Sequence, residues 1–114
     1  MSLSEKQRLF TKNIARLITF VYFNLPGYEL TFGEAYRTKE QQEIYFKQGK
    51  SKTMNSKHLD RLAVDFNLFI NGVYQTSTEA YKPLGEYWMS LDKNNVWGGS
   101  WKSFPDGNHY EYGE

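Results

Sequence analysis

Apolar residues near the N-terminus recur at the spacing of one helix face. They are Phe10, Ile14, Leu17 and Val21. This period predicts an amphipathic helix that packs one side against a core. Ser4 followed by Gln7 resembles a capping box at its start, and Pro26-Gly27 would stop it.

The pattern then changes to a loose alternation over residues 28–37, which predicts a strand with Gly33 as a possible bulge. Thr38 can cap a second helix over residues 39–48, which would end at Gly49. Residues 51–55 are polar and predict a loop.

Residues 62–70 are apolar with two polar interruptions, which predicts a buried strand. Asn71-Gly72 predicts a tight hairpin turn into residues 73–74. A third helix is expected over residues 77–91, Pro83 falling in its early part, and a last strand over residues 108–112. We therefore expect one α+β domain over residues 1–114, with a small antiparallel sheet packed against about three helices.

Composition and charge argue against several classes of function. A formal charge of +1 gives no support for a nucleic-acid partner, and the absence of cysteine excludes disulfides and a thiolate zinc site. The N-terminus lacks the charged-then-apolar order of a signal peptide, and the apolar stretch over residues 14–25 is too short for membrane insertion. We expect a monomer that is made in the cytoplasm.

The two histidines of the chain both lie where a metal site would need them. Asp65 interrupts an apolar strand, His58 precedes it by seven residues, and His109 would come from the last strand, paired beside the first. A buried carboxylate requires a partner, and two imidazoles with one carboxylate are the ligands of an open zinc site. The alternative is a surface histidine, with Asp65 paired to Arg37 or Arg61.

Three segments resemble one family. Residues 56–65 carry Ser-x-His followed after six residues by Asp, and residues 97–111 carry Gly-Gly-x-Trp with a later Asp-x-x-His-Tyr-Glu. These motifs resemble those of the M15 metallopeptidases, a family that includes D-alanyl-D-alanine carboxypeptidases and phage L-alanyl-D-glutamate endolysins. Residues 36–42 and 48–51 also look like the endolysin branch. One position departs from the pattern, because many relatives carry glycine where this chain has Arg61.

The resemblance implies Zn²⁺ held by His58, Asp65 and His109, with the metal site at the sheet. It places Asp106 at the position of the catalytic carboxylate, although Pro105-Asp106-Gly107-Asn108 is also a strong turn sequence. Glu111 is the rival base, or else it orients a ligand imidazole.

The matching arginine, Arg37, would stabilise an oxyanion or hold substrate, with a salt bridge to Glu34 or Glu40 as the alternative. Weaker candidates for substrate contacts are Ser56, Gln42 and Trp101. Ser56 could instead brace the loop before His58. Trp97 and Trp101 could wall a groove or belong to the core.

The resemblance therefore implies a zinc peptidase that hydrolyses an amide bond in peptidoglycan stem peptides. The segments that resemble the endolysin branch favour the L-alanyl-D-glutamate bond. They imply a phage or prophage enzyme that acts on the cell wall after holin-type release. The alternatives are a D-alanyl-D-alanine carboxypeptidase, a cell-wall binding module without catalysis, and an interaction protein that uses its aromatic surface.

Overall fold

The computed structural model describes residues 1–51 and 53–113. Its helices and strands, in chain order, are α1 (Leu3–Asn24), β1 (Tyr28–Phe32), α2 (Lys39–Lys47), β2 (Ala63–Ile70), β3 (Val73–Tyr74), α3 (Lys82–Leu91), β4 (Asn95–Trp97) and β5 (His109–Tyr112). Three short 3-10 helices connect them, which are η1 (Lys57–Asp60), η2 (Thr78–Tyr81) and η3 (Gly98–Ser100).

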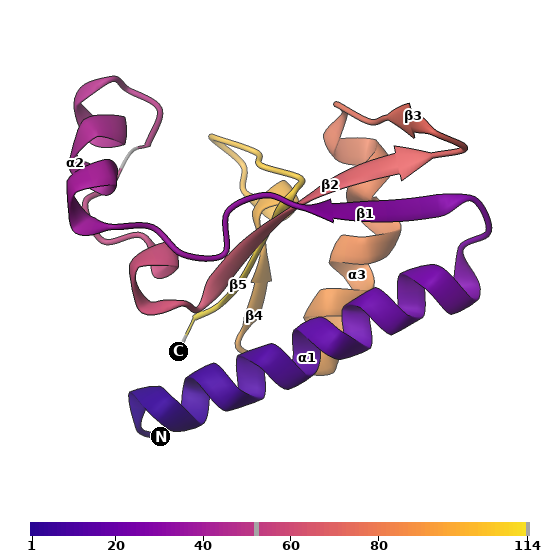
Figure 1. Ribbon diagram of the computed structural model, residues 1–114, viewed down its shortest axis with the longest axis horizontal. Helices are drawn as coiled ribbons and strands as arrows, with labels where there is room; N and C mark the ends of the chain where they lie inside the picture. Colours follow the sequence, from indigo (N-terminus) through magenta and orange to yellow (C-terminus); the bar gives the residue numbers. More distant parts are fainter. Residues whose placement is uncertain (52, 114) are drawn as a thin grey trace.

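The strands form one antiparallel sheet in the order β1-β2-β5-β4, with β3 added as a short partner of β2. Helices α1 and α3 pack together beside this sheet. Helix α2 lies away from them, past the C-terminal end of β1 (Figure 1). The expected α+β architecture with a small antiparallel sheet is confirmed.

The two faces of the sheet have different chemistry. In β2, Val64, Phe66 and Leu68 are buried in the core with residues from α1 and α3. Successive side chains of a strand point to opposite faces, so Asp65 points away from this core. In β5 the same alternation sends Tyr110 into the core and leaves His109 on the face of Asp65.

The predicted face of α1 is confirmed, because Phe10, Ile14, Leu17 and Val21 are all buried. The predicted cap is wrong by two residues. The Ser2 side chain accepts a hydrogen bond from the backbone N–H of Glu5, and the Glu5 carboxylate accepts one from the backbone N–H of Ser2. A carboxylate at the third helical position is a stronger reciprocal acceptor than the Gln7 amide.

Other boundaries also differ from the prediction. Strand β1 ends at Phe32, and the segment that leads to Arg37 is irregular. The predicted third helix is divided, with Ser77 capping η2 and Pro83 in the first turn of α3. Strand β4 is an element that the sequence pattern did not predict. Lys52, in the predicted loop over residues 51–55, lies outside the described residues.

The position where many relatives carry glycine has a left-handed backbone. Arg61 ends η1 with φ of 55°, a conformation that glycine adopts without steric cost. The Arg61 guanidinium carbon lies 4.1 Å from the centroid of the Tyr36 ring, and this cation–π contact offsets part of the strain. Over the described residues, no helix has the length and apolarity needed to cross a bilayer.

Candidate metal centre

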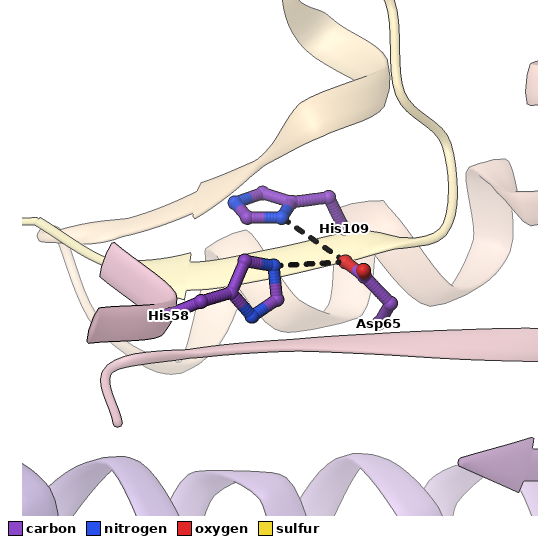
Figure 2. A group of neighbouring side chains, drawn as sticks. All are labelled: His58, Asp65 and His109. Atoms are coloured by element: carbon purple, nitrogen blue, oxygen red, sulfur yellow. Dashed lines mark hydrogen bonds and ion pairs between the residues drawn. The ribbon is translucent and has the colours of Figure 1, made fainter. Parts of the chain in front are cut away.

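Three side chains from two distant segments meet on the polar face of the sheet (Figure 2). Asp65 of β2 lies directly opposite His109 of β5, and His58 comes from η1 just before β2. The Asp65 Oδ1 atom is 3.4 Å from His58 Nε2 and 3.1 Å from His109 Nδ1. The pairing that the sequence suggested therefore brings all three predicted ligands together.

These separations fit one tetrahedral ion. Ligands about 2.0–2.2 Å from a zinc ion at tetrahedral angles are roughly 3.3–3.6 Å from one another. The 3.4 Å and 3.1 Å contacts are close to that edge length, and one ligand atom from each residue lies within 4.8 Å of the others. Two imidazoles and a carboxylate also have the donor chemistry that zinc prefers, so the residues fit the ion.

Mutual charge stabilisation is strong in this group. Burial alone would raise the pKa of Asp65, but hydrogen bonds from His109 and His58 outweigh it and lower this pKa to about 2. Burial would lower the pKa of His109, but the carboxylates of Asp65 and Glu111 raise it to about 9. The site therefore favours a cation between its carboxylates.

Glu111 contacts the far side of the His109 ring. Its Oε1 atom is 2.7 Å from His109 Nε2, while Nδ1 faces Asp65. A hydrogen bond from Nε2–H to this carboxylate fixes the tautomer that leaves the Nδ1 lone pair free for a metal. This position supports the orienting role of Glu111 over the role of base.

Asp106 lies on the turn before β5 and lines the cleft beside the three ligands. Its backbone N–H donates to the Gly98 carbonyl at 3.0 Å, and its carbonyl accepts from the N–H of His109 at 3.2 Å. Within the described part of the chain, the Asp106 carboxylate has no hydrogen-bond partner. Burial, and then the negative charge of Asp65, raise its pKa above the ordinary value.

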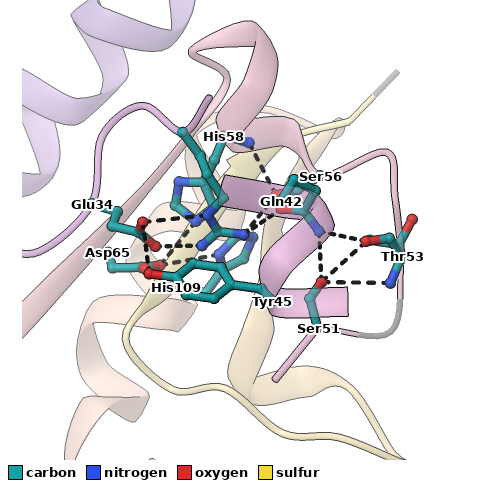
Figure 3. Close-up of polar contacts among 10 residues, drawn as sticks. Glu34, Gln42, Tyr45, Ser51, Thr53, Ser56, His58, Asp65 and His109 are labelled. Carbon is teal, nitrogen blue, oxygen red and sulfur yellow. Dashed lines mark hydrogen bonds and ion pairs between the residues drawn. The ribbon is translucent and has the colours of Figure 1, made fainter. Parts of the chain in front are cut away.

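Arg37 is held by hydrogen bonds to Glu34 and Gln42. Figure 3 shows these two side chains beside the candidate metal ligands. The Arg37 Nε and Nη2 atoms donate to the two carboxylate oxygens of Glu34, and Nη1 donates to Gln42 at 2.6 Å and to Ser56 at 3.5 Å. The salt bridge to Glu34, given above as the alternative role of Arg37, is thus present, whereas Glu40 makes none among the described residues. Of the five guanidinium N–H groups, one on Nη2 remains for another acceptor.

Gln42 is fully buried and does not line the cleft. Its amide nitrogen donates to Ser51 at 2.8 Å and to the Thr53 carbonyl, so it ties α2 to the loop before η1. A substrate contact does not fit this position. Ser56 lines the cleft and also accepts a hydrogen bond from the N–H of His58 at 3.2 Å, which braces the loop.

The two tryptophans of the glycine-rich segment have different positions. Trp101 lines the cleft, with its ring centroid 5.1 Å from that of His109. Trp97 belongs to the core and packs so closely on Gly85 and Gly99 that a Cβ on either would lie 2.0 or 2.1 Å from its ring. Its indole N–H donates to the Gly107 carbonyl at 2.7 Å and so supports the turn of Asp106.

The cleft has a volume of about 670 Å³, a size typical of small-ligand sites. Its lining includes eight of the nine predicted site residues, which are Arg37, Ser56, His58, Asp65, Trp101, Asp106, His109 and Glu111. Sequence reasoning missed the lining residues Tyr45, Lys50, Lys57 and Phe104. Their spacing carries no metal or acid–base signal, so the sequence alone offered no means of selecting them.

Comparison with known proteins agrees with this geometry. Residues 49–112 match the profile of the M15 peptidase family described as D-alanyl-D-alanine carboxypeptidase. The chain belongs to the M15 peptidase family. The matched segment contains all three candidate ligands of this M15 chain, together with Asp106 and Glu111.

Three proteins are similar to this M15 chain in sequence or in fold. It is 32% identical over 93 residues to the L-alanyl-D-glutamate peptidase of Listeria phage A118, covering 75% of this chain and 31% of that protein's length. Its fold is similar to that of the L-Ala D-Glu endopeptidase ChiX of Serratia marcescens, with a TM-score of 0.73 and 24% identity, over 96% of this chain and 84% of ChiX. It is also similar to the D,D-pentapeptidase VanY from a VanB-type resistance cassette, solved with Zn(II), with a TM-score of 0.59 and 21% identity, over 91% and 70% of the two chains.

Proposed function

We propose that this M15 chain is a zinc-dependent peptidase that hydrolyses an amide bond in the stem peptides of bacterial peptidoglycan. The observation that carries the proposal is one cleft that joins three zinc-type ligands, the unpartnered carboxylate of Asp106 and the guanidinium of Arg37. We favour the L-alanyl-D-glutamate bond, because the similar Listeria phage and Serratia proteins are named for it.

His58, Asp65 and His109 would hold the zinc ion. When bound, zinc would supply Lewis acidity, which polarises the scissile carbonyl and lowers the pKa of an attacking water molecule. The residues of the chain would orient the substrate and move protons around that centre.

Asp106 is the best candidate for the proton acceptor. Its carboxylate faces the cleft without a competing partner among the described residues, and its raised pKa brings it closer to the range in which a base can also return the proton. The proton would then pass to the leaving amine. Glu111 is less suited to this role because its carboxylate already bonds to His109 Nε2.

Arg37 would stabilise negative charge that develops on the carbonyl oxygen. Glu34 and Gln42 fix the plane of the guanidinium before substrate arrives, and one N–H on Nη2 stays available. A preorganised donor of this kind stabilises a transition state without reorganising as the charge forms.

A second candidate is a D-alanyl-D-alanine carboxypeptidase. The description of the matching family and the likeness to VanY favour it. A binding module without catalysis is the third candidate, although the complete set of ligands and the free Asp106 carboxylate argue against it. Action on the cell wall after release from the cytoplasm, and a monomeric state, stay predictions.

The test is hydrolysis of purified peptidoglycan by zinc-loaded protein, with elemental analysis for zinc and mass spectrometry of the fragments. We expect about one zinc ion per chain and new alanyl C-termini with D-glutamyl N-termini. Release of terminal D-alanine would instead establish the carboxypeptidase, and zinc binding without any cleavage would leave the binding module.

Three substitutions separate the roles at the site. Asp106→Ala should keep zinc and lose hydrolysis, whereas His58→Ala should lose zinc. Glu111→Ala should weaken zinc binding by about 10–100-fold, the usual effect of removing a partner of a ligand imidazole. Hydrolysis by Asp106→Ala, with none by a zinc-loaded Glu111→Ala protein, would overturn the choice of base.

A further inference from the structure

Two unlike walls enclose the cleft beside the metal centre. The segment before His58 contributes a polar wall, and Figure 3 shows Ser51, Thr53 and Ser56 of this wall grouped on the α2 side of the ligands. The segment after η3 contributes Trp101 and Phe104 to the lining. The cleft is therefore chemically asymmetric, and it can distinguish a charged side of a substrate from an apolar one.

Most charges that line this cleft are already paired within the protein. Glu34 bonds to Arg37, and Asp65 and Glu111 both bond to His109. Glu34 therefore compensates the charge of Arg37, and the one remaining N–H of Arg37 is the donor assigned above to the carbonyl oxygen of the substrate. Any carboxylate on a substrate must find its main electrostatic partner elsewhere in the cleft.

Among the residues that the structure describes, the other lysines of the lining are Lys50 and Lys57, both on the polar wall. In the residues that the structure describes, neither ammonium group makes an ion pair or a hydrogen bond. Lys57 is half-buried in η1, directly before the candidate ligand His58, and it lines the same cleft as the three candidate ligands. Partial burial of this kind strengthens attraction for an anion.

We propose that Lys57, assisted by Lys50, forms a carboxylate-binding subsite that recognises the residue supplying the leaving amine. This inference rests on the proposed peptidase function and specifies its substrate. The recognised group is a free α-carboxylate next to the scissile nitrogen.

The chemistry of both candidate bonds supports this group. A D-glutamyl residue that continues the stem peptide through its side-chain carboxyl keeps its α-carboxylate free, and a terminal D-alanine also has a free carboxylate. In each case the anion is attached to the carbon that bears the leaving nitrogen. A cation that fixes this carboxylate also fixes the nitrogen relative to Asp106, because only two bonds separate them.

The experiment uses two synthetic stem peptides that differ only at the D-glutamyl α-carboxyl group, which is free in one and amidated in the other. The measured quantity is the ratio of kcat/KM for the acid to kcat/KM for the amide. We expect the zinc-loaded wild-type protein to prefer the acid by about tenfold, and Lys57→Met to lower the ratio about fivefold, as for one partly exposed ion pair. Lys50→Met should lower it less.

Lys47→Met is the matched control, because it removes the same charge from a lysine on α2 that pairs with Glu43 away from the cleft. It should leave the ratio unchanged. Equal cleavage of both peptides by the wild-type protein, or an unchanged ratio in Lys57→Met, would overturn the subsite while leaving the peptidase function intact. Cleavage of neither peptide, nor of purified peptidoglycan, would instead refute the proposed function.

Discussion

Gly98 is the residue at which a single methyl group should damage the site most. A Cβ built on Gly98 would lie 2.3 Å from the Asp106 carbonyl oxygen and 2.9 Å from the Cβ of His109. The backbone of Gly98 does not have a positive φ, so alanine is acceptable there in conformation. Gly98→Ala therefore tests close packing of the turn against η3 and not backbone strain.

The size of the effect follows from the distance. Real Cβ atoms essentially never approach another atom closer than 3.0 Å, so the Asp106 carbonyl must move by at least 3.0 − 2.3 = 0.7 Å. A displacement of about 1 Å at a reacting group can cost about 100-fold in rate. We expect turnover of a stem peptide to fall between about tenfold and 100-fold, with weaker zinc binding because His109 moves as well.

The assays are turnover, zinc titration by calorimetry and thermal unfolding followed by circular dichroism. Overpacking should also cost about 1–3 kcal/mol of stability. Gly49→Ala is the control, because its Cβ would meet nothing within 4 Å but its φ of +75° strains any other residue. It should lower stability and spare the site. Wild-type turnover and zinc affinity in Gly98→Ala would refute the reasoning.

Three other outcomes can be checked directly. Glu34→Gln weakens the hydrogen bonds that orient Arg37 and should lower kcat about tenfold. In an Arg37→Ala background the same substitution should have no effect, and an equal loss of kcat in both would show that Glu34 does not act through Arg37. Trp97→Phe leaves the Gly107 carbonyl without its donor and should cost about 1–3 kcal/mol in urea unfolding, so an unchanged midpoint would count against that hydrogen bond. Because the pKa of His109 is raised from 6.5 to about 9, zinc must displace a proton at neutral pH. Zinc affinity should therefore rise roughly tenfold per pH unit up to that pKa, with about one proton released in calorimetry, and a pH-independent affinity would exclude this linkage.

The buried face of α1 was predictable because its signal is local and periodic, and the grouping of the three candidate metal ligands because one of them is a carboxylate in an apolar strand. The buried face of α1 follows from the spacing of its four apolar residues. Asp65 stood out because a carboxylate in an apolar strand needs a partner. The register that places His109 opposite it follows from a strand pairing that the sequence could suggest but not align.

Elements that depend on tertiary contacts were not predictable. Strand β4 has only three residues and begins with the buried polar side chain of Asn95, so it has no strand signal of its own. The neutralisation of Arg37 by Glu34 depends on the irregular backbone after β1. Lys50 and Lys57 lie in segments that resemble the family, but nothing in those segments marks either lysine as functional, since exposed and functional lysines look alike in a sequence.

The packing of Trp97 limits how this protein can be made more robust. Gly85 lies at the end of the first turn of α3, and replacing a helical glycine by alanine would ordinarily add up to about 1 kcal/mol to the stability of a helix. Here the added methyl group would occupy the space of the indole, 2.0 Å from its nearest ring atom. A thermostabilising screen should therefore reject Gly85→Ala, although helix propensity favours it. The methyl group would stabilise the helix but would displace the Trp97 ring, which supports the turn after β4.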